Sequence, residues 1–335
     1  MSPRRITAVF VARNREFFRD RSTLAWSIIL PVAIVFGFAF AFSGSAPERY
    51  TVGVLGDPAV AAERLDIDGV EYARVADRDA GLDKVRRHRL DLLIDLDARR
   101  YWVSDASPKG YLLERVLWGV AAEGPSTFER ATVPGRTIRY VDWLVPGLLA
   151  MNMMFTALFG VGFVIVRYRK NGVLKRLKAT PLTPAEFLVA QLASRLMIIV
   201  AITSAIFVGS HAILDFPLYG SPLALLLVLV LGGICLIALG LIIAARTASE
   251  ELAGGLLNMM SWPMMFLSGV WFSTEGLHPW LQALARALPL THVIEAARAV
   301  MIDGAGLAAI APNLAVLLAM SVVFLALGAL AFRWE

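Results

Sequence analysis

Long apolar runs recur along this chain, and short segments rich in Arg and Lys separate several of them. A helix of roughly 20 apolar residues is long enough to cross the hydrocarbon core of a bilayer. The pattern therefore predicts a mainly α-helical, polytopic membrane protein with six transmembrane helices. The expected spans are Leu24–Phe42, Trp143–Val166, Phe187–Val208, Leu223–Ala245, Leu252–Phe272 and Ala311–Phe332.

The polar regions between these runs divide the chain into four parts. We expect an amphipathic interfacial helix at residues 1–22, the first transmembrane helix at 23–42, a small α/β domain at 43–141 and a five-helix membrane domain at 142–335. A basic leader before an apolar run also suits a signal peptide. The first run exceeds the roughly 7–15 residues of a signal core, which favours a retained span.

The leader has a helical pattern of its own. Its apolar face comprises Ile6, Val9, Phe10 and Phe17, and Arg4, Arg15 and Arg19 lie opposite. Such a basic amphipathic helix is typical of a membrane interface. Arg13 falls on the apolar face and would have to extend its charge toward water. A disordered positive tail that only sets the topology is the alternative.

The distribution of Lys and Arg predicts the orientation. Both the leader and the loop at residues 167–186 are strongly basic, whereas the loop at 211–222 has no Lys or Arg. Short basic loops remain in the cytoplasm. Six spans then place both termini in the cytoplasm and the 43–141 segment outside, as expected for a multi-pass protein of the bacterial inner membrane.

The outer segment has the pattern of a small folded domain. Apolar strands are expected at Thr51–Asp57 and Leu90–Asp97, with a weaker one at Leu65–Val75 and charged or amphipathic helices at Asp79–Arg89 and Tyr111–Ala122. Alternation of strand and helix predicts an α/β module. Asp91, Asp95 and Asp97 alternate along one strand, which is typical of a solvated face more often than of a cation site.

The basic loop is punctuated in a way that predicts a short, rigid helix. Gly172 breaks the preceding helix, Val173–Lys178 forms the short one, and Thr180-Pro181 ends it. Leu174 and Leu177 would form an apolar edge surrounded by cations. Thr183 to Glu186 resembles a helix N-cap. The loop suits docking to a cytoplasmic partner; a loop that serves only topology is the alternative.

The segment Phe266–Arg298 is too apolar for a soluble loop and too interrupted for a span. We expect it to enter one face of the bilayer, with broken helices near the outer leaflet at residues 273–300. Within it, Glu295 and Arg298 are spaced to form an ion pair. The residues that identify this segment are Gly269, Trp271, Pro279, Trp280 and Pro289.

Composition agrees with a membrane protein and narrows the chemistry. Hydrophobic residues are 58% of the chain and charged residues 18%, against about 45–50% and about 25% in soluble domains. No phosphate-binding loop, zinc motif or nucleophile elbow occurs, and Cys235 is the single cysteine. We therefore expect no catalytic residues, no metal site and no nucleic-acid partner, although the net charge is +5.

Four features together resemble the permease subunit of an ABC-2 type transporter. They are the leader running into the first span, the loop YRKNGVLKRLKATPLTPAEFLVAQL, the segment FLSGVWFSTEGLHPWLQALARALPLTHVIEAAR and the six-span plan. Many relatives carry an acidic residue before the loop glycine, whereas Lys170-Asn171 stand here. The resemblance implies a coupling loop that contacts a separate ATPase through Gly172, Val173, Leu174, Arg176, Leu177, Thr180 and Pro181.

The resemblance also implies an assembly and a path. Two permease subunits, identical or related, would pair above two cytoplasmic P-loop ATPase subunits that hold the ATP and Mg. The chain itself would bind no cofactor. A path between the permeases would be lined by Asn152, Asn258, Ser261 and Met264. Arg195, embedded in the third span, has no assigned role.

Export is the direction that the resemblance favours. The large outer domain and the apolar spans suit a lipophilic drug, lipid or hydrophobic peptide as cargo, and the family resemblance also allows polysaccharide, haem or ions. A secondary transporter or channel that acts alone is one alternative, and the chain shows no inverted repeat or charge relay of the kind such proteins have. A membrane scaffold with an outer binding domain is the other. A scaffold would need neither the shaped basic loop nor the broken apolar segment.

Overall fold

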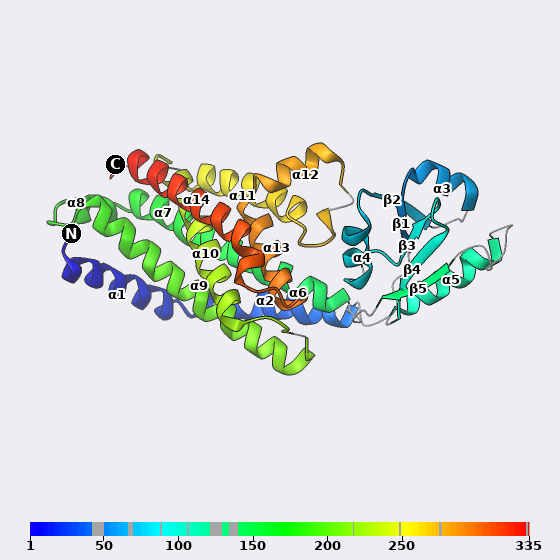
Figure 1. The fold of residues 1–335 in the computed structure, drawn as a ribbon. Coiled ribbons are helices and arrows are strands. Elements are labelled where there is room, and N and C mark those ends of the chain that lie inside the picture. Colours follow the sequence, from blue (N-terminus) through cyan, green and yellow to red (C-terminus); the bar gives the residue numbers. More distant parts are fainter. Residues whose placement is uncertain are drawn as a thin grey trace. The chain divides into compact units, whose positions relative to one another are not determined.

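The fold was examined in a computed structural model. It describes residues 1–41, 50–65, 70–87, 89–105, 107–120, 129–133, 140–216, 218–247, 249–274, 277–332 and 334. The chain forms two compact units, one of residues 1–41 with 141–335 and one of residues 42–140. The first is a helical bundle and the second contains the sheet (Figure 1).

The helical unit begins with two helices joined end to end, α1 (Pro3–Arg19) and α2 (Arg21–Ala41). The chain returns to it in α6 (Tyr140–Ala157), which continues without a turn through a π-helix, η2 (Leu158–Phe163), into α7 (Val164–Lys170). The remaining helices are α8 (Val173–Lys178), α9 (Pro184–Leu214), α10 (Pro222–Ala244), α11 (Glu250–Leu267), α12 (Pro279–Arg286), α13 (Pro289–Met301) and α14 (Leu307–Ala331).

Helix α10 lies at the centre of this unit. It packs against α9, α11, α13, α14 and η2. Small residues allow the close approaches: a Cβ atom at Gly240 would lie 3.1 Å from the backbone of Leu158. Glycines at helix interfaces are typical of membrane bundles, where packing rather than hydrophobicity holds the helices together.

Among the residues that the structure describes, four helical stretches are long and apolar enough to cross a bilayer, namely Tyr140–Lys170, Pro184–Leu214, Pro222–Ala244 and Leu307–Ala331. They correspond to the predicted second, third, fourth and sixth spans. A fifth is counted only if α1 and α2, which meet at 65°, form one bent span. Helix α11 is not among them, because Glu250, Glu251 and Asn258 lower its hydropathy and it ends at Leu267 instead of the predicted Phe272. The six-span plan therefore stays a prediction.

The apolar face of α1 is covered by protein. Ile6, Val9 and Phe10 are half-buried and Phe17 is buried, and α1 packs along α9 (Figure 1). The position of α1 at the membrane interface stays a prediction. Arg13 does not extend toward water as expected. It is buried and donates to Glu16 Oε2 at 2.9 Å.

The second unit contains one five-stranded sheet in the order β2-β1-β3-β4-β5. Its elements are β1 (Tyr50–Leu55), α3 (Pro58–Leu65), β2 (Val70–Val75), α4 (Arg78–Arg86), β3 (Leu92–Asp95), β4 (Arg100–Ser104), α5 (Pro108–Val120) and β5 (Glu129–Val133). Among the described strands, β3 and β4 pair antiparallel and the other neighbours pair parallel; for example, Leu93 of β3 lies opposite Trp102 of β4.

Apolar side chains cover both faces of this sheet. One cluster joins Val54 and Leu92 to Ala61 of α3 and Leu113 of α5, and the other joins Leu93 and Trp102 to Val85 of α4. The unit is thus three layers deep, with helices on both faces. The predicted α/β module is confirmed as a fold, while its side of the membrane is not tested.

Candidate functional site

The basic loop between α7 and α9 has the local structure that the sequence predicts. Gly172 adopts φ +71°, in the left-handed region that favours glycine, and separates α7 from α8. Helix α8 spans Val173–Lys178, as expected. At its end the Thr180 hydroxyl donates to the Leu177 carbonyl at 2.6 Å. The loop is therefore a defined structure within this chain.

The apolar edge expected on α8 is not where it was predicted. Leu174 is fully buried within this chain and Leu177 is half-buried. Because residues one turn apart share a helix face, burial of Leu174 turns the opposite face outward. Lys175, Arg176 and Lys178 are exposed there, as are Thr180 and Pro181. The surface that α8 offers to a partner is cationic.

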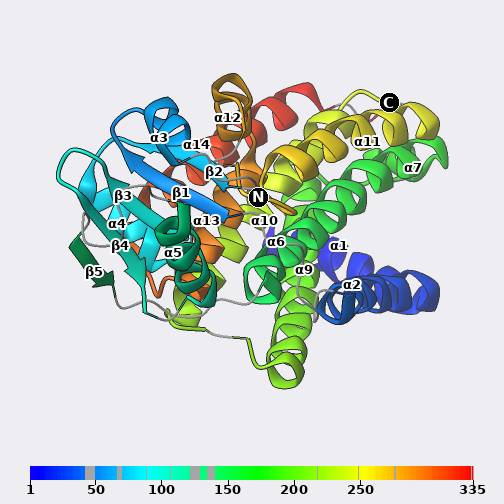
Figure 2. The same cartoon turned by 90° about the vertical axis from the view of Figure 1, so that its right-hand side faces the viewer.

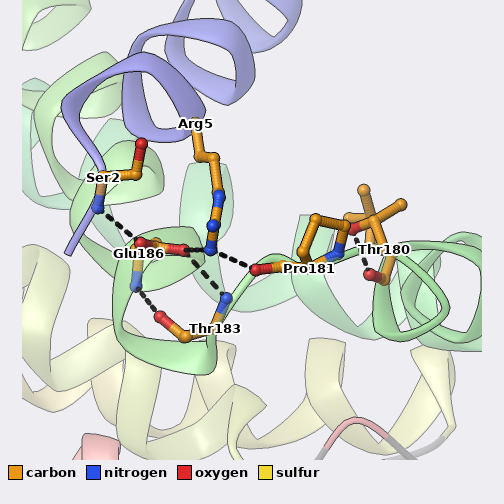
Figure 3. Close-up of polar contacts among 7 residues, drawn as sticks. Ser2, Arg5, Thr180, Pro181, Thr183 and Glu186 are labelled. Carbon is orange, nitrogen blue, oxygen red and sulfur yellow. Dashed lines mark hydrogen bonds and ion pairs between the residues drawn. The ribbon is translucent and has the colours of Figure 1, made fainter.

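A capping box starts α9, in agreement with the expected N-cap. The Thr183 side chain accepts from the Glu186 N–H at 3.3 Å, and Glu186 Oε2 accepts from the Thr183 N–H at 3.0 Å (Figure 3). The two side chains thus satisfy backbone donors that the first helical turn would leave unpaired. Residue Pro184 occupies the first helical position.

Glu186 has a second task that sequence reasoning missed. Its Oε1 accepts from the Ser2 N–H at 2.7 Å, and its Oε2 lies 3.5 Å from the Arg5 guanidinium (Figure 3). Arg5 also donates to the Pro181 carbonyl. Glu186 is buried, so this carboxylate ties the start of α1 to the end of the basic loop. Ser2 and Arg5 are far from Glu186 in the sequence, so the residues around Glu186 do not predict these contacts.

Arg169 fixes the other end of the loop. Its guanidinium donates to the carbonyls of Ala244 at 2.9 Å and Ala245 at 3.0 Å, and also to that of Thr247. The last carbonyls of a helix lack intrahelical donors and carry partial negative charge, so a cation is favourable at this end of α10. The sequence indicates a topology role for this arginine, and the structure shows that it also joins α7 to α10.

A weaker contact joins the same end of the loop to α11. Lys170 Nζ lies 3.7 Å from a Glu250 carboxylate oxygen, and α7 runs beside α11 (Figure 2). Next to it, the Ser249 hydroxyl donates to Glu251 at 2.6 Å and lowers the pKa of that carboxyl, with a further contribution from Lys170. Lys170 at the end of α7 thus pairs with an acidic residue of α11.

The four residues expected along a path between two subunits differ in exposure within this chain, and their role stays a prediction. Asn258 is exposed on α11 and donates to the Gly254 carbonyl at 2.9 Å. Ser261 and Met264 are fully buried, with the Ser261 hydroxyl bonded to the Leu257 carbonyl. Asn152 on α6 is half-buried, and its Nδ2 atom is buried with no hydrogen-bond acceptor among the described residues.

The broken apolar segment is built as its glycine and prolines predict. Gly269 adopts φ +81° just after α11, and Pro279 and Pro289 each occupy the first position of a short helix. Trp271 packs on Phe38 of α2 with ring centroids 4.9 Å apart, and Trp280 is exposed. Helix α13 is buried along most of its length instead of lying open at a surface.

The expected ion pair in this segment is wrong. Glu295 is exposed, and Arg298 turns instead to the start of α6. Its Nε donates to the Trp143 carbonyl at 3.1 Å, and its guanidinium carbon lies 3.6 Å from the centroid of the Trp143 ring. Stacking on the ring and donation to the backbone both suit a planar guanidinium. Arg298 therefore holds α13 against α6.

The family model for ABC-2 type transporters matches residues 99–302 of this chain, which is more than half of it. The chain belongs to the ABC-2 type transporter family. The match takes in the basic loop, α11 and the broken apolar segment, so two of the four features on which the resemblance rested lie inside it, whereas the leader and the first predicted span lie outside. This ABC-2 chain is a multi-pass membrane protein of the permease type.

Named relatives agree with this assignment. The ABC-2 chain is 24% identical over 190 residues to the inner membrane transport permease YhhJ of Escherichia coli K12, which covers 56% of this chain and 51% of the relative. It is 26% identical over 173 residues to the probable multidrug ABC transporter permease YbhR of the same organism, covering 50% and 46%.

A third relative is named for drug resistance. The daunorubicin resistance permease DrrB1 of Streptomyces coeruleorubidus is 24% identical over 174 residues, covering 51% of the ABC-2 chain and 60% of the relative. The alignments span about half the length of the first relatives named here. The family assignment rests on the family model, and these relatives agree with it.

Carboxylates in the sheet unit serve its backbone. Asp91 Oδ2 accepts from the Thr51 N–H at 2.8 Å, and Asp95 Oδ1 accepts from the N–H groups of Asp97 and Ala98. Within the described parts of this ABC-2 chain, no cluster of three or more His, Cys, Asp or Glu side chains is placed to hold a metal ion.

Proposed function

We propose that this chain is the membrane subunit of an ATP-driven ABC-2 exporter in a bacterial inner membrane. In this proposal six helices cross the bilayer, both termini face the cytoplasm, and the unit of residues 42–140 lies outside. ATP and Mg are held by a separate P-loop ATPase. Family membership supports the transporter role, and the basic residues of the α7–α9 loop support the orientation.

The observation that carries the proposal is the shape of the basic loop. A six-residue helix presents Lys175, Arg176 and Lys178, while its buried Leu174 anchors it to this chain. Arg169 and Glu186 tie the two ends of the loop to α10 and α1. A loop needed only for topology would not require such fixation. We expect the ATPase to offer an acidic groove to these cations.

A second permease subunit, the same chain or a related one, is expected on the exposed face of α11. This face carries Asn258 among large apolar side chains, namely Leu252, Met259, Trp262 and Phe266. A polar amide within an apolar membrane face favours a helix partner or a cavity. The cargo is expected to be lipophilic, in keeping with the multidrug and daunorubicin resistance names of two relatives.

The test is affinity purification of the tagged chain from native membranes in mild detergent, followed by an ATP hydrolysis assay. Co-purification of an ATPase is expected from the parent chain. The variant Lys175→Gln, Arg176→Gln, Lys178→Gln should lose it while remaining inserted and monodisperse. Leu174→Asp is unsuitable, because a charge at this buried position would disrupt the loop itself.

A matched control removes three exposed charges from the sheet unit: Arg74→Gln, Arg86→Gln and Arg99→Gln. It should retain the ATPase. Recovery of the chain alone, under conditions that keep other membrane complexes intact, would instead favour a self-sufficient transporter or channel, or a scaffold. Retention of the ATPase by the loop variant would show that α8 is not its docking element.

A further inference from the structure

Arg195 is seated where a side chain is missing from the facing helix. It lies on α9, and its guanidinium packs directly on Gly160 in the π-helix η2. A Cβ atom at Gly160 would lie 1.5 Å from Nη2 and 1.7 Å from Cζ of Arg195. No side chain fits at position 160 while the guanidinium stays there.

The contacts of Arg195 explain how a charge is held in a predicted span. Its Nε donates to the Thr156 carbonyl at 2.9 Å, and its guanidinium carbon lies 5.7 Å from the centroid of the Phe17 ring. No ion pair to Arg195 occurs among the described residues. Backbone carbonyls are common partners for such intramembrane cations. This arginine therefore joins α9 to the last turn of α6, where the π-helix begins, and to α1.

A second arginine reaches the same π-helix from α1. Arg13 Nη2 lies 3.4 Å from the Gly160 carbonyl, and its Nη1 donates to Glu16 at 2.9 Å and to the Tyr168 hydroxyl at 3.2 Å. Beside them the Ser194 hydroxyl donates to Asn14 Oδ1 at 2.9 Å. Helix α1 is thus joined to η2, α7 and α9 by polar contacts on both sides of Gly160.

We propose that Arg195, seated on Gly160, is a positioning residue that makes α1 and the π-helical part of the second span move as one body. The proposal rests on the proposed function, because the body so formed also carries the basic loop: α7 continues from η2, and Glu186 ties α1 to the loop. A displacement of α8 would then be transmitted through η2 to α6, instead of being lost in a separate movement of α1.

Two unfavourable local choices support a role beyond packing. Glycine weakens a helix interior, and a cation in a span is unfavourable. Each is explained by the other, since the glycine makes the space that the guanidinium fills. The π-helix, a form found mostly as single interruptions and often at functional sites, lies at the same place.

The first measurement is a distance between spin labels at Ala12→Cys on α1 and Asn171→Cys at the end of α7, both exposed positions, in a Cys235→Ala background. The parent should give one narrow distribution. Gly160→Ala, which displaces the guanidinium, and Arg195→Met, which removes it, should each broaden it. Gly209→Ala, an equal change on α9 with open space around it, should not.

The double variant Gly160→Ala, Arg195→Met distinguishes loss of the Arg195–Gly160 contact from general damage to the helices. If the glycine acts only through the arginine, the double variant is no broader than either single variant, because the two changes remove the same interaction. Additive broadening would overturn the proposal, as would an unchanged distribution in both single variants.

The second measurement is cargo transported per ATP hydrolysed, in vesicles that contain the permease and its co-purified ATPase. A several-fold fall in this ratio is expected for Gly160→Ala and Arg195→Met and not for Gly209→Ala. Broadened distances with an unchanged ratio would overturn the coupling role. If no ATPase-dependent transport exists, the proposed function fails. The label distances still decide whether Arg195 holds α1 and η2 together.

Discussion

At the residue scale, three arginines of the helical unit donate to backbone carbonyls of another helix. Arg169 serves the end of α10, Arg195 the last turn of α6 and Arg298 the start of α6. Each joins two helices that are distant in the sequence. In an apolar bundle such contacts satisfy the charge and set the helix positions together.

Arg169→Gln should destabilise the bundle by removing the charged donor from the last carbonyls of α10. Hydrogen bonds to charged groups contribute about 1.5–3 kcal/mol each, and part of this should be lost. Thermal unfolding in detergent measures the effect. Arg167→Gln is the control, because Arg167 is exposed and its loss should cost no more than about 1 kcal/mol, the upper value for its exposed cation–π contact with Phe163. Equal losses in both variants would mean that the carbonyl contacts are not responsible.

At the element scale, Glu186 performs two separable tasks at the start of α9. It completes the capping box with Thr183, and it holds the first turn of α1 through Ser2 and Arg5. The first task belongs to one helix and the second joins two. Helix α1 is held again further along by Arg13 and Asn14, so the two attachments restrain different turns of the same helix.

Glu186→Gln should loosen the first turns of α1 and leave the Asn14–Phe17 part attached. Hydrogen exchange followed by mass spectrometry should therefore show faster exchange in the α1 start and the first turn of α9. Thr183→Ala is the matched variant: it removes only the cap, which is worth about 1 kcal/mol, and should speed exchange in α9 alone. Faster exchange of α1 in both variants would mean that the two tasks are not separate.

The sequence predicts local elements well because their signals are local. Gly172, Pro181 and the Thr183 cap predict where the helices of the basic loop begin and end. In the structure α8 begins directly after Gly172 and ends before Pro181, and α9 begins directly after Thr183. The inward turn of Leu174 could not be predicted, because a six-residue helix has too few positions to show which face is buried. The partners of Glu186, Arg169 and Arg195 could not be predicted either, since they depend on how distant helices are arranged.

At the scale of the whole molecule, the chain consists of a helical unit with a continuous sheet unit inserted into it. The chain leaves the helical unit once, to form the unit of residues 42–140, and then returns to it once. The sheet unit has apolar clusters on both faces of its sheet, and all residues of these clusters belong to that unit. A unit with its own core and one entry and exit satisfies the usual requirements for independent folding.

We expect residues 42–140 to fold when expressed alone. The isolated segment should give mixed α and β circular dichroism and one cooperative thermal transition. Trp102→Ala, which removes a buried ring from one cluster, should lower its stability by about 3–5 kcal/mol. A segment without a cooperative transition would show that the bundle is needed to complete its core.

The seating of Arg195 on Gly160 also constrains how these two positions can change during evolution. An ordinary side chain at position 160 would collide with the guanidinium, and a short residue at position 195 would leave a gap above the glycine. The two positions should therefore covary among homologues that share the π-helix: glycine with arginine, and larger residues at 160 with smaller ones at 195. An alignment deep enough to count these pairs would check it, and independent variation at the two positions would contradict it.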